Sequence, residues 1–207
     1  MYSREIKVKE HHSDMPDHFA GHQIHLKTAR LHLRPFREAD FEIAEAYYQD
    51  PEFLNAMEGE PPADPPTADS LKRVGRIMAD QGFLFAIVER ASGRTIGEVC
   101  LQWMNLDRAK ILGEKVMRMP IGIWDKSLWG RGYGREVVCC LMEYAFEVLE
   151  IDRLRPMDVS VDNARSVALW RACGLRIAGE SSDRKLDFEI TRSEYVRQRP
   201  FHPEKNP

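Results

Sequence analysis

Three glycines at alternate positions, Gly130, Gly132 and Gly134, directly precede an apolar-periodic segment, and they constrain this chain more than any other feature. The segment 136–149 has apolar residues at helical spacing, which predicts a helix. A glycine-rich turn entering a helix leaves backbone N–H groups without partners at the positive end of the helix dipole. Such a helix start is well suited to phosphate. The sequence therefore predicts a site for a phosphorylated ligand at residues 129–135.

Length and composition favour a single domain. The chain has 207 residues, of which 43% are hydrophobic and 30% charged, and this is enough for one sizeable core. We predict one domain over residues 23–200, with a loosely held N-terminal extension at 1–22 and a C-terminal tail at 201–207. The formal net charge is -3 and basic residues are dispersed along the chain, which argues against nucleic acid as a partner.

The cysteines and the lack of long apolar runs predict where in the cell the protein is found. The four cysteines lack metal-ligand spacing, which favours packed, reduced thiols and a cytoplasmic protein. No apolar run has the length of a signal peptide or a membrane span, so we expect neither export nor membrane contact. The N-terminal extension carries histidines, but a solvated tail explains them better than a metal site, and no metal is expected. These are His11, His12, His18 and His22.

The apolar pattern predicts a mixed α/β fold. Strands and hairpins come first and a strand–helix–strand crossover follows, so the sheet should have antiparallel N-terminal strands, a central parallel pair and helices on both faces. The predicted strands are 25–34, 82–90, 95–103, 116–124, 154–161, 176–179 and 185–191. The predicted helices are 40–50, capped by Asp40 and ended by Pro51, then 67–80, 136–149 and 164–173. Residues 58–66 are acidic and proline-rich, which predicts a loop.

The glycine run alone leaves three other interpretations open. A P-loop needs Lys followed by Ser or Thr, where this chain has Arg135 and Glu136. A dinucleotide-binding turn needs Gly-x-Gly-x-x-Gly after the first strand of a doubly wound unit; that spacing is missing, although Asp158 lies near the position of a ribose-binding acid. A purely structural turn that lets a helix pack closely would also use glycine.

A second motif distinguishes between these interpretations. Asn163 begins a predicted helix, Ser166 lies one turn inside it, and Gly174 follows its end. Taken together with the glycine run, and with a predicted strand between the two motifs, these residues resemble the GNAT superfamily of acyl-coenzyme A N-acyltransferases.

The resemblance covers nearly all of residues 24–199 and is closest to the RimJ/RimL-like branch, named for N-terminal acetylation of ribosomal proteins. Residues 28–40 are similar to its opening Thr-x-Arg-Leu-x-Leu-Arg-Pro, and residues 129–136 to its Trp-Gly-Lys-Gly-Tyr-Ala-Thr-Glu loop. The segments 121–124 and 187–195 resemble its strand before the loop and its usual ending.

The resemblance implies acetyl-coenzyme A as co-substrate and direct transfer of its acetyl group to a primary amine in a ternary complex. In the family, the glycine loop cradles the diphosphate, the later helix lies beside the pantetheine, and a backbone N–H of the preceding strand polarises the thioester carbonyl. Such a contact can be worth about 3 kcal/mol. The cofactor-binding residues implied are Gly122, Ile123, Trp124, Trp129, Gly130, Arg131, Gly132, Tyr133, Gly134, Arg135, Asn163, Ser166 and Trp170.

The proton donor to the departing thiolate differs from the common family pattern. Many members carry a Tyr seven residues after the Asn, where this chain has Trp170, whose indole has no proton of suitable acidity. Similarity to RimL-like proteins implies Ser166 instead. A first-turn hydroxyl that merely bonds nearby backbone is the alternative.

The general base is less narrowly defined. The resemblance points to Glu98, on a strand that faces the acceptor, and to Glu180 in the final hairpin, with Glu114 and Asp183 as further candidates. Each also fits a solvated surface charge, and a water relay would need no single residue. Glu136 suits a helix start rather than catalysis because its charge complements the dipole.

The acceptor stays open between a protein N-terminus, a small cationic amine and an aminoglycoside-like drug. The acidic loop 58–66 borders the acceptor in this fold and would suit a cation. Monomer and homodimer are both compatible with the sequence. The alternative function is a catalytically weak or inactive acetyl-coenzyme A sensor or interaction module, favoured by the missing Tyr.

Overall fold

A ten-stranded sheet organises the part of the chain described by the computed structural model, which comprises residues 19–58, 64–182 and 184–198. Its strands are β1 (Leu26–Lys27), β2 (Leu31–Pro35), β3 (Gly82–Glu89), β4 (Thr95–Trp103), β5 (Val116–Arg118), β6 (Ile121–Ile123), β7 (Arg153–Leu154), β8 (Val159–Ser160), β9 (Arg176–Ser182) and β10 (Lys185–Thr191). The helices are α1 (Asp40–Tyr48), α2 (Pro51–Glu58), α3 (Ala68–Asp80), α4 (Asp107–Leu112), α5 (Tyr133–Glu147), α6 (Ala164–Ala172) and α7 (Arg192–Gln198), with a short 3-10 turn, η1 (Lys126–Leu128).

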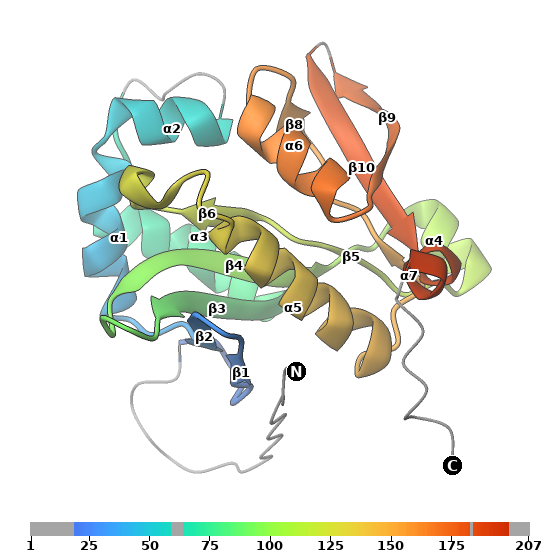
Figure 1. Cartoon of the computed structure of the whole chain (residues 1–207), viewed down its shortest axis with the longest axis horizontal. Helices are drawn as coiled ribbons and strands as arrows, with labels where there is room; N and C mark the ends of the chain where they lie inside the picture. Colours follow the sequence, from blue (N-terminus) through green and yellow to red (C-terminus); the bar gives the residue numbers. More distant parts are fainter. Residues whose placement is uncertain (1–18, 59–63, 183, 199–207) are drawn as a thin grey trace.

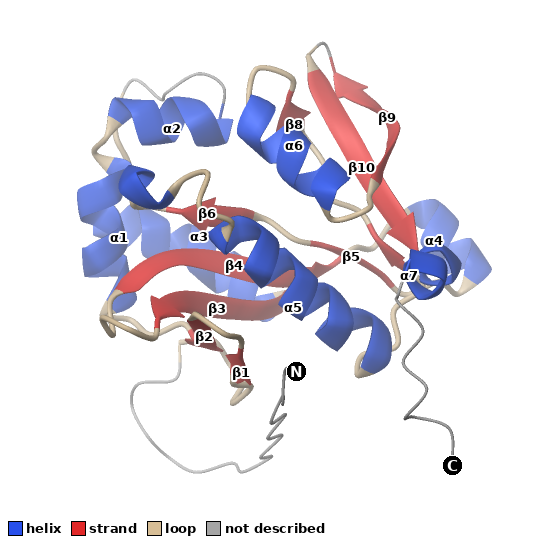
Figure 2. Cartoon of the chain, in the orientation of Figure 1, coloured by secondary structure: helices blue, strands red, loops and turns tan. Residues whose placement is uncertain are grey.

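The strand pairing confirms the predicted mixed α/β class. The order is β1-β2-β3-β4-β5-β7-β10-β8, with β6 on β4 and β9 on β10. Every described pairing is antiparallel except that of β5 with β7, which is parallel. Figure 2 shows helices on both faces of the curved sheet.

Two apolar clusters flank the sheet. Helix α5 buries Val137, Val138 and Leu141 on one face, while Phe41 of α1 and the fully buried Trp124 belong to the cluster on the other. Figure 1 shows α5 in front of the strands, with α1 and α3 on the opposite side. Both faces of the central strands are therefore covered, as their long apolar runs require.

Two predicted strands are interrupted. The predicted strand 25–34 is broken by a turn, in which Thr28 Oγ1 accepts a hydrogen bond from Leu31 N at 2.9 Å, so β1 and β2 form a hairpin. The predicted strand 116–124 keeps one register along β4 but divides into β5 and β6 around Pro120, which has no N–H to donate.

Helix boundaries near the N-terminus also differ from the prediction. Pro51 begins α2 instead of ending a helix, since proline is tolerated in the first turn. Asp40 lies inside α1 and is not its cap. Residues 19–22, expected in a loose extension, pack on the domain: Phe19 contacts the ring of Phe41, and His22 Nε2 lies 3.0 Å from Leu84 O.

The predictions about membrane contact, metal and cysteines concern residues that the structure describes in part. Within the described ranges, no helix is long and apolar enough to cross a membrane, and no group of His, Cys, Asp and Glu is arranged to hold a metal. None of the four cysteines, all of which lie within the described ranges, forms a disulfide. Asp183, most of the acidic loop and residues 1–18 lie outside the described residues.

The buried ion pair between Arg34 and Asp40 should be a major contributor to stability. Arg34 Nη1 and Nη2 each donate to one Asp40 oxygen at 2.7 Å, and the Asp40 side chain is 3% exposed. We expect Asp40→Ala to lower the free energy of unfolding by about 3 kcal/mol, because a buried guanidinium is left unpaired. The control Asp162→Ala removes the partner of the exposed Arg184 and should change little in the same urea titration. Equal losses in the two variants would contradict this expectation.

Candidate functional site

The sheet opens beside β6. Strand β7 pairs with β5, but after Leu154 the chain turns away, and β8 pairs with β10. Asp158 lies in this turn with a left-handed backbone (φ 59°). Among the described strands, β6 therefore has β4 on one side and no partner on the other.

The backbone groups of β6 alternate between β4 and this unpaired edge. Trp124 N donates to Ile96 O at 2.9 Å, just beyond the end of the strand. Because hydrogen-bonded pairs recur at every second residue of an antiparallel ladder, Gly122 also bonds β4, opposite Glu98, and Ile123 N–H points into the unpaired edge. Of the three N–H groups implied by resemblance, the structure thus leaves that of Ile123 available to a bound group.

The glycine loop is shaped by two left-handed residues. Gly130 and Gly132 have φ of 72° and 80°, which side-chain-bearing residues adopt at a cost. Gly132 immediately precedes α5, and the first bond of the helix runs from Glu136 N to Gly132 O at 3.1 Å. The N–H groups of Tyr133 to Arg135 come before that bond and have no partner in the described residues. They present a positive helix end to any anion held there.

The turn between β1 and β2 fixes the loop. Glu136 accepts hydrogen bonds from the Thr28 hydroxyl, from Arg30 N at 2.9 Å and from Arg30 Nε at 2.6 Å. Arg30 also donates to Arg131 O at 2.9 Å and lies over the Tyr133 ring at 4.2 Å. Burial disfavours the Glu136 carboxylate, but the hydrogen bonds outweigh it and hold its pKa below the usual value. Glu136 is thus a structural anchor, and its partner Arg30 was not predicted from the sequence, where it looks like an ordinary strand residue.

Trp129 connects the loop to both β6 and α6. Its Nε1 donates to Ile123 O at 2.8 Å, and the Arg165 guanidinium lies 4.1 Å from its ring centroid. A Cβ added to Gly134 would lie 3.4 Å from Leu169 of α6, so α5 and α6 approach closely. Figure 1 shows the start of α5 next to β6, with α6 above them. The two sequence motifs therefore meet at the unpaired edge.

The first turn of α6 carries one hydroxyl that has no hydrogen-bond partner among the described residues. Asn163 Oδ1 caps the helix by accepting from Ser166 N at 3.0 Å, while its Nδ2 donates to Ala56 O of α2. Ser166 is half-buried, and its hydroxyl makes no hydrogen bond within the described residues, so local backbone bonding does not account for it. Trp170 is 2% exposed within the core, which gives its side chain almost no surface for the ligand contact expected of it.

Glu98 is a half-buried carboxylate on the strand paired with β6. It lies opposite Gly122 in the ladder, and a Cβ on Gly122 would be 3.7 Å from Glu98 Oε1. Burial raises the pKa of the Glu98 carboxyl, although the hydrogen bond from Tyr48 OH at 2.5 Å opposes the shift. The buried Trp124 Nε1 also lies near enough to favour the charged form, but it makes no hydrogen bond of normal geometry. A carboxyl in this setting is suited to exchange a proton at moderate pH.

The other carboxylates lie in different surroundings. Both Glu114 oxygens accept from Arg153 Nη2 at 3.0 Å, and Arg153 also binds Glu189, so Glu114 belongs to a structural ion-pair network. Glu180 is exposed on β9, which pairs only with β10 among the described strands. The structure therefore brings Glu98, and neither of these two, to the face of Gly122.

Comparison with known proteins identifies the class of the chain. Residues 30–176 match the Acetyltransferase (GNAT) domain family. This span is most of the chain, so the protein belongs to the GNAT acetyltransferase family and is an N-acetyltransferase by class.

Individual relatives share the same fold at low identity. The chain is 24% identical over 182 residues to the uncharacterized N-acetyltransferase p20 of Bacillus licheniformis, covering 83% of this chain and 98% of that protein. A GNAT-family acetyltransferase from Bacillus anthracis aligns with a TM-score of 0.65 and 14% identity over 82% of this chain and 99% of its own. A spermidine N-acetyltransferase from Vibrio cholerae, solved with CoA and spermine, gives a TM-score of 0.65, 19% identity and the same coverage.

Alanine substitution should cost more stability at Gly132, which has a left-handed backbone, than at Gly134, which lies in α5. Gly132→Ala forces a side chain into φ 80° and should destabilise the protein by about 1–2 kcal/mol. Gly134→Ala is the matched control, since its Cβ would make only ordinary contact with Leu169 and alanine favours helix. Thermal unfolding of both variants, with titration of coenzyme A, checks the expectation. Equal stability and equal affinity in the two variants would show that the left-handed turn is not required.

Proposed function

We propose that this protein transfers the acetyl group of acetyl-coenzyme A to a primary amine by direct attack in a ternary complex. The observation that carries the proposal is the unpaired outer edge of β6 beside the N-terminus of α5. An unpaired strand edge can hydrogen-bond an extended amide-bearing chain such as pantetheine, as it would another strand. The adjacent helix start suits the diphosphate.

The described residues offer a suitable group for each part of acetyl-coenzyme A. The N–H groups of Tyr133 to Arg135 would face the diphosphate, with the Arg131 and Arg135 guanidinium groups as further cationic contacts. The Ile123 N–H would polarise the thioester carbonyl. Trp129 covers Ile123 O and so removes a carbonyl acceptor from the same edge.

The reaction needs two proton movements, and the site offers a residue for each. As the amine nitrogen forms its bond to the carbonyl carbon, the C–S bond breaks and the thiolate departs. We assign Glu98 as the base that takes the amine proton, directly or through water, because it is the carboxylate next to Gly122. We assign Ser166 as the donor to the thiolate, because its hydroxyl has no other partner in the described residues. The hydroxyl regains a proton from water as Glu98 releases the amine proton, so that no net proton is gained or lost.

Both a small cationic amine and a protein N-terminus fit this chemistry. The similar Vibrio cholerae protein is a spermidine N-acetyltransferase, which supports a small amine. The RimJ/RimL-like motifs of the sequence support a protein N-terminus. Both acceptors therefore stay candidates. A cytoplasmic location and a monomeric or dimeric state stay predictions of the sequence.

One observation favours a second candidate function, an acetyl-coenzyme A sensor without turnover. Trp170 fills the place where a catalytic Tyr often stands, and it is buried in the core. Release of free thiol across a panel of amines separates the two functions. Repeated turnover with any amine supports the transferase, while stoichiometric binding without thiol release supports the sensor.

Removing the Ser166 hydroxyl should slow the chemical step. We expect Ser166→Ala to lower kcat by about 100-fold while the KM for acetyl-coenzyme A changes little, because the hydroxyl acts only as charge develops on sulfur. Ser166→Thr keeps a hydroxyl and should retain more activity. Unchanged turnover of Ser166→Ala would remove Ser166 from the mechanism.

The raised pKa of Glu98 should be visible in the pH dependence of kcat/KM. A base works deprotonated, so activity should fall as the pH drops through the Glu98 pKa, above the usual carboxyl range. Tyr48→Phe removes a hydrogen bond that favours the carboxylate, so this acidic limb should move to higher pH. Glu98→Gln should abolish the limb with a loss of about 100-fold or more. An acidic limb that stays in place in both variants belongs to another group, such as the acceptor amine.

A further inference from the structure

Helix α2 brings a methionine to the carboxylate face of β6. A Cβ on Gly122 would lie 3.5 Å from Met57 Cε and 3.7 Å from both Met57 Sδ and Glu98 Oε1. These are ordinary contact distances, so Gly122, Met57 and Glu98 border one small space. An amine that passes its proton to Glu98 has to enter that space.

Core packing does not explain the position of Met57. Helix α2 is anchored by Phe53 and Leu54, which are 1% and 3% exposed, whereas Met57 is 36% exposed. Tyr48, whose hydroxyl binds Glu98, packs edge-on against Phe53 at 5.1 Å. Tyr48 therefore contacts both the buried face of α2 and the Glu98 carboxylate, and Met57 of the same helix lies near them.

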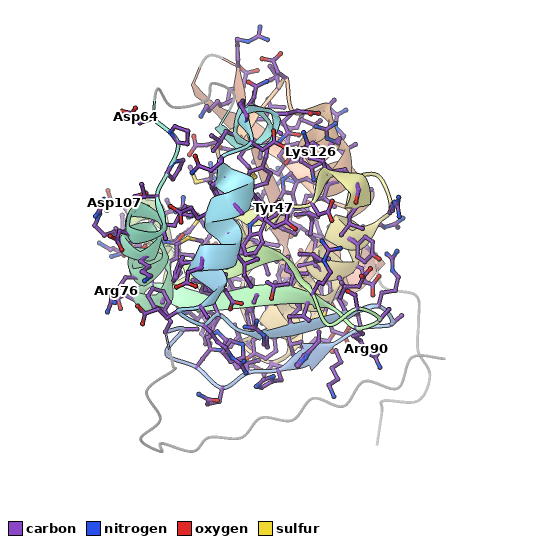
Figure 3. All side chains as sticks on the ribbon, turned by 90° about the vertical axis from the view of Figure 1, so that its left-hand side faces the viewer. Tyr47, Asp64, Arg76, Arg90, Asp107 and Lys126 are labelled. Atoms are coloured by element: carbon purple, nitrogen blue, oxygen red, sulfur yellow. The ribbon has the colours of Figure 1, made fainter. Side chains whose placement is uncertain are left out.

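Polar contacts hold α2 near both of its ends. At the N-terminal end, Lys126 Nζ lies 2.7 Å from Asp50 Oδ2 and 2.7 Å from Glu52 Oε2, and Figure 3 shows Lys126 beside α2. Near the C-terminal end, Asn163 Nδ2 donates to Ala56 O, and Ala56 is the residue before Met57. Asn163 also caps α6 through its Oδ1, so one amide joins the helix beside the glycine loop to the helix that carries Met57.

We propose that Met57 limits the acceptor to primary amines on an unbranched carbon, and that Asn163 positions Met57 through α2. The inference rests on the proposed function. A CH2–NH2 end is narrow enough to pass the thioether and reach Glu98. An amine on a branched carbon, as in most protein N-termini, brings a second substituent against Met57. The site thus favours a small alkyl amine over a protein N-terminus.

A matched pair of acceptors tests the role of Met57. Thiol release is measured for n-propylamine and isopropylamine at one saturating concentration of acetyl-coenzyme A, and the ratio of their kcat/KM values is compared between proteins. We expect the native chain to prefer n-propylamine by about tenfold or more, since one methyl group in a tight site discriminates to this extent. Met57→Ala should reduce the ratio toward one, and the volume-conserving Met57→Leu should preserve it.

The outcomes separate this inference from the proposed function. Turnover with an unchanged ratio in Met57→Ala, or no preference in the native chain, overturns the inference and leaves the transferase in place. No turnover with any amine overturns the proposed function and the inference with it.

Asn163→Asp tests the positioning role without removing the helix cap. The carboxylate keeps an oxygen for Ser166 N but loses the donor to Ala56 O. We expect the acceptor ratio to fall as in Met57→Ala. Because both amines are compared at the same acetyl-coenzyme A concentration, a general loss of cofactor binding or stability would not move the ratio. An unchanged ratio would remove Asn163 from this role.

Discussion

The rest of the site depends on one constraint, which is that β6 pairs with β4 on one side and with no described strand on the other. Strand β5 is paired on both sides, by β4 and by the parallel β7, whereas β6 continues along β4 alone. A paired β6 would have its outer N–H groups satisfied within the protein. Since no described strand pairs with that edge, Ile123 N–H faces outward beside the start of α5. One change in strand pairing thus leaves an open strand edge beside the N-terminus of α5, a helix end of the kind that suits an anion.

Rigid support makes these backbone groups useful. Glu136 ties the first turn of α5 to the turn between β1 and β2 through Thr28 and Arg30, and Trp129 ties the loop to β6. Dipoles that are already oriented need no rearrangement when charge develops, which is the main source of electrostatic catalysis. Thr28 and Arg30 lie far from β6 in the sequence, yet they hold the glycine loop beside it.

Strand alternation directs neighbouring residues of β6 to opposite faces of the sheet. Side chains of Ile121 and Ile123 pack toward the α5 cluster, while Gly122 faces Glu98 and Met57 on the α2 side. A cofactor at the edge of β6 and an amine arriving from α2 would therefore meet across a single glycine. Asn163 joins the two sides, because its amide bonds to α6 with one atom and to α2 with the other.

The sequence by itself determined the features that depend on local chemistry. Apolar runs bounded by turn residues placed β3 and β4 almost to the residue, the glycine run located the turn before α5, and Asn163 marked the start of α6. Pairing and burial required the tertiary structure. Which N–H of β6 points outward follows from its register with β4. The raised pKa of Glu98 follows from its burial, and the hydrogen bond from Tyr48, fifty positions away in the sequence, opposes that shift. Neither register nor burial is encoded in a short window of residues, since both arise only when distant segments meet.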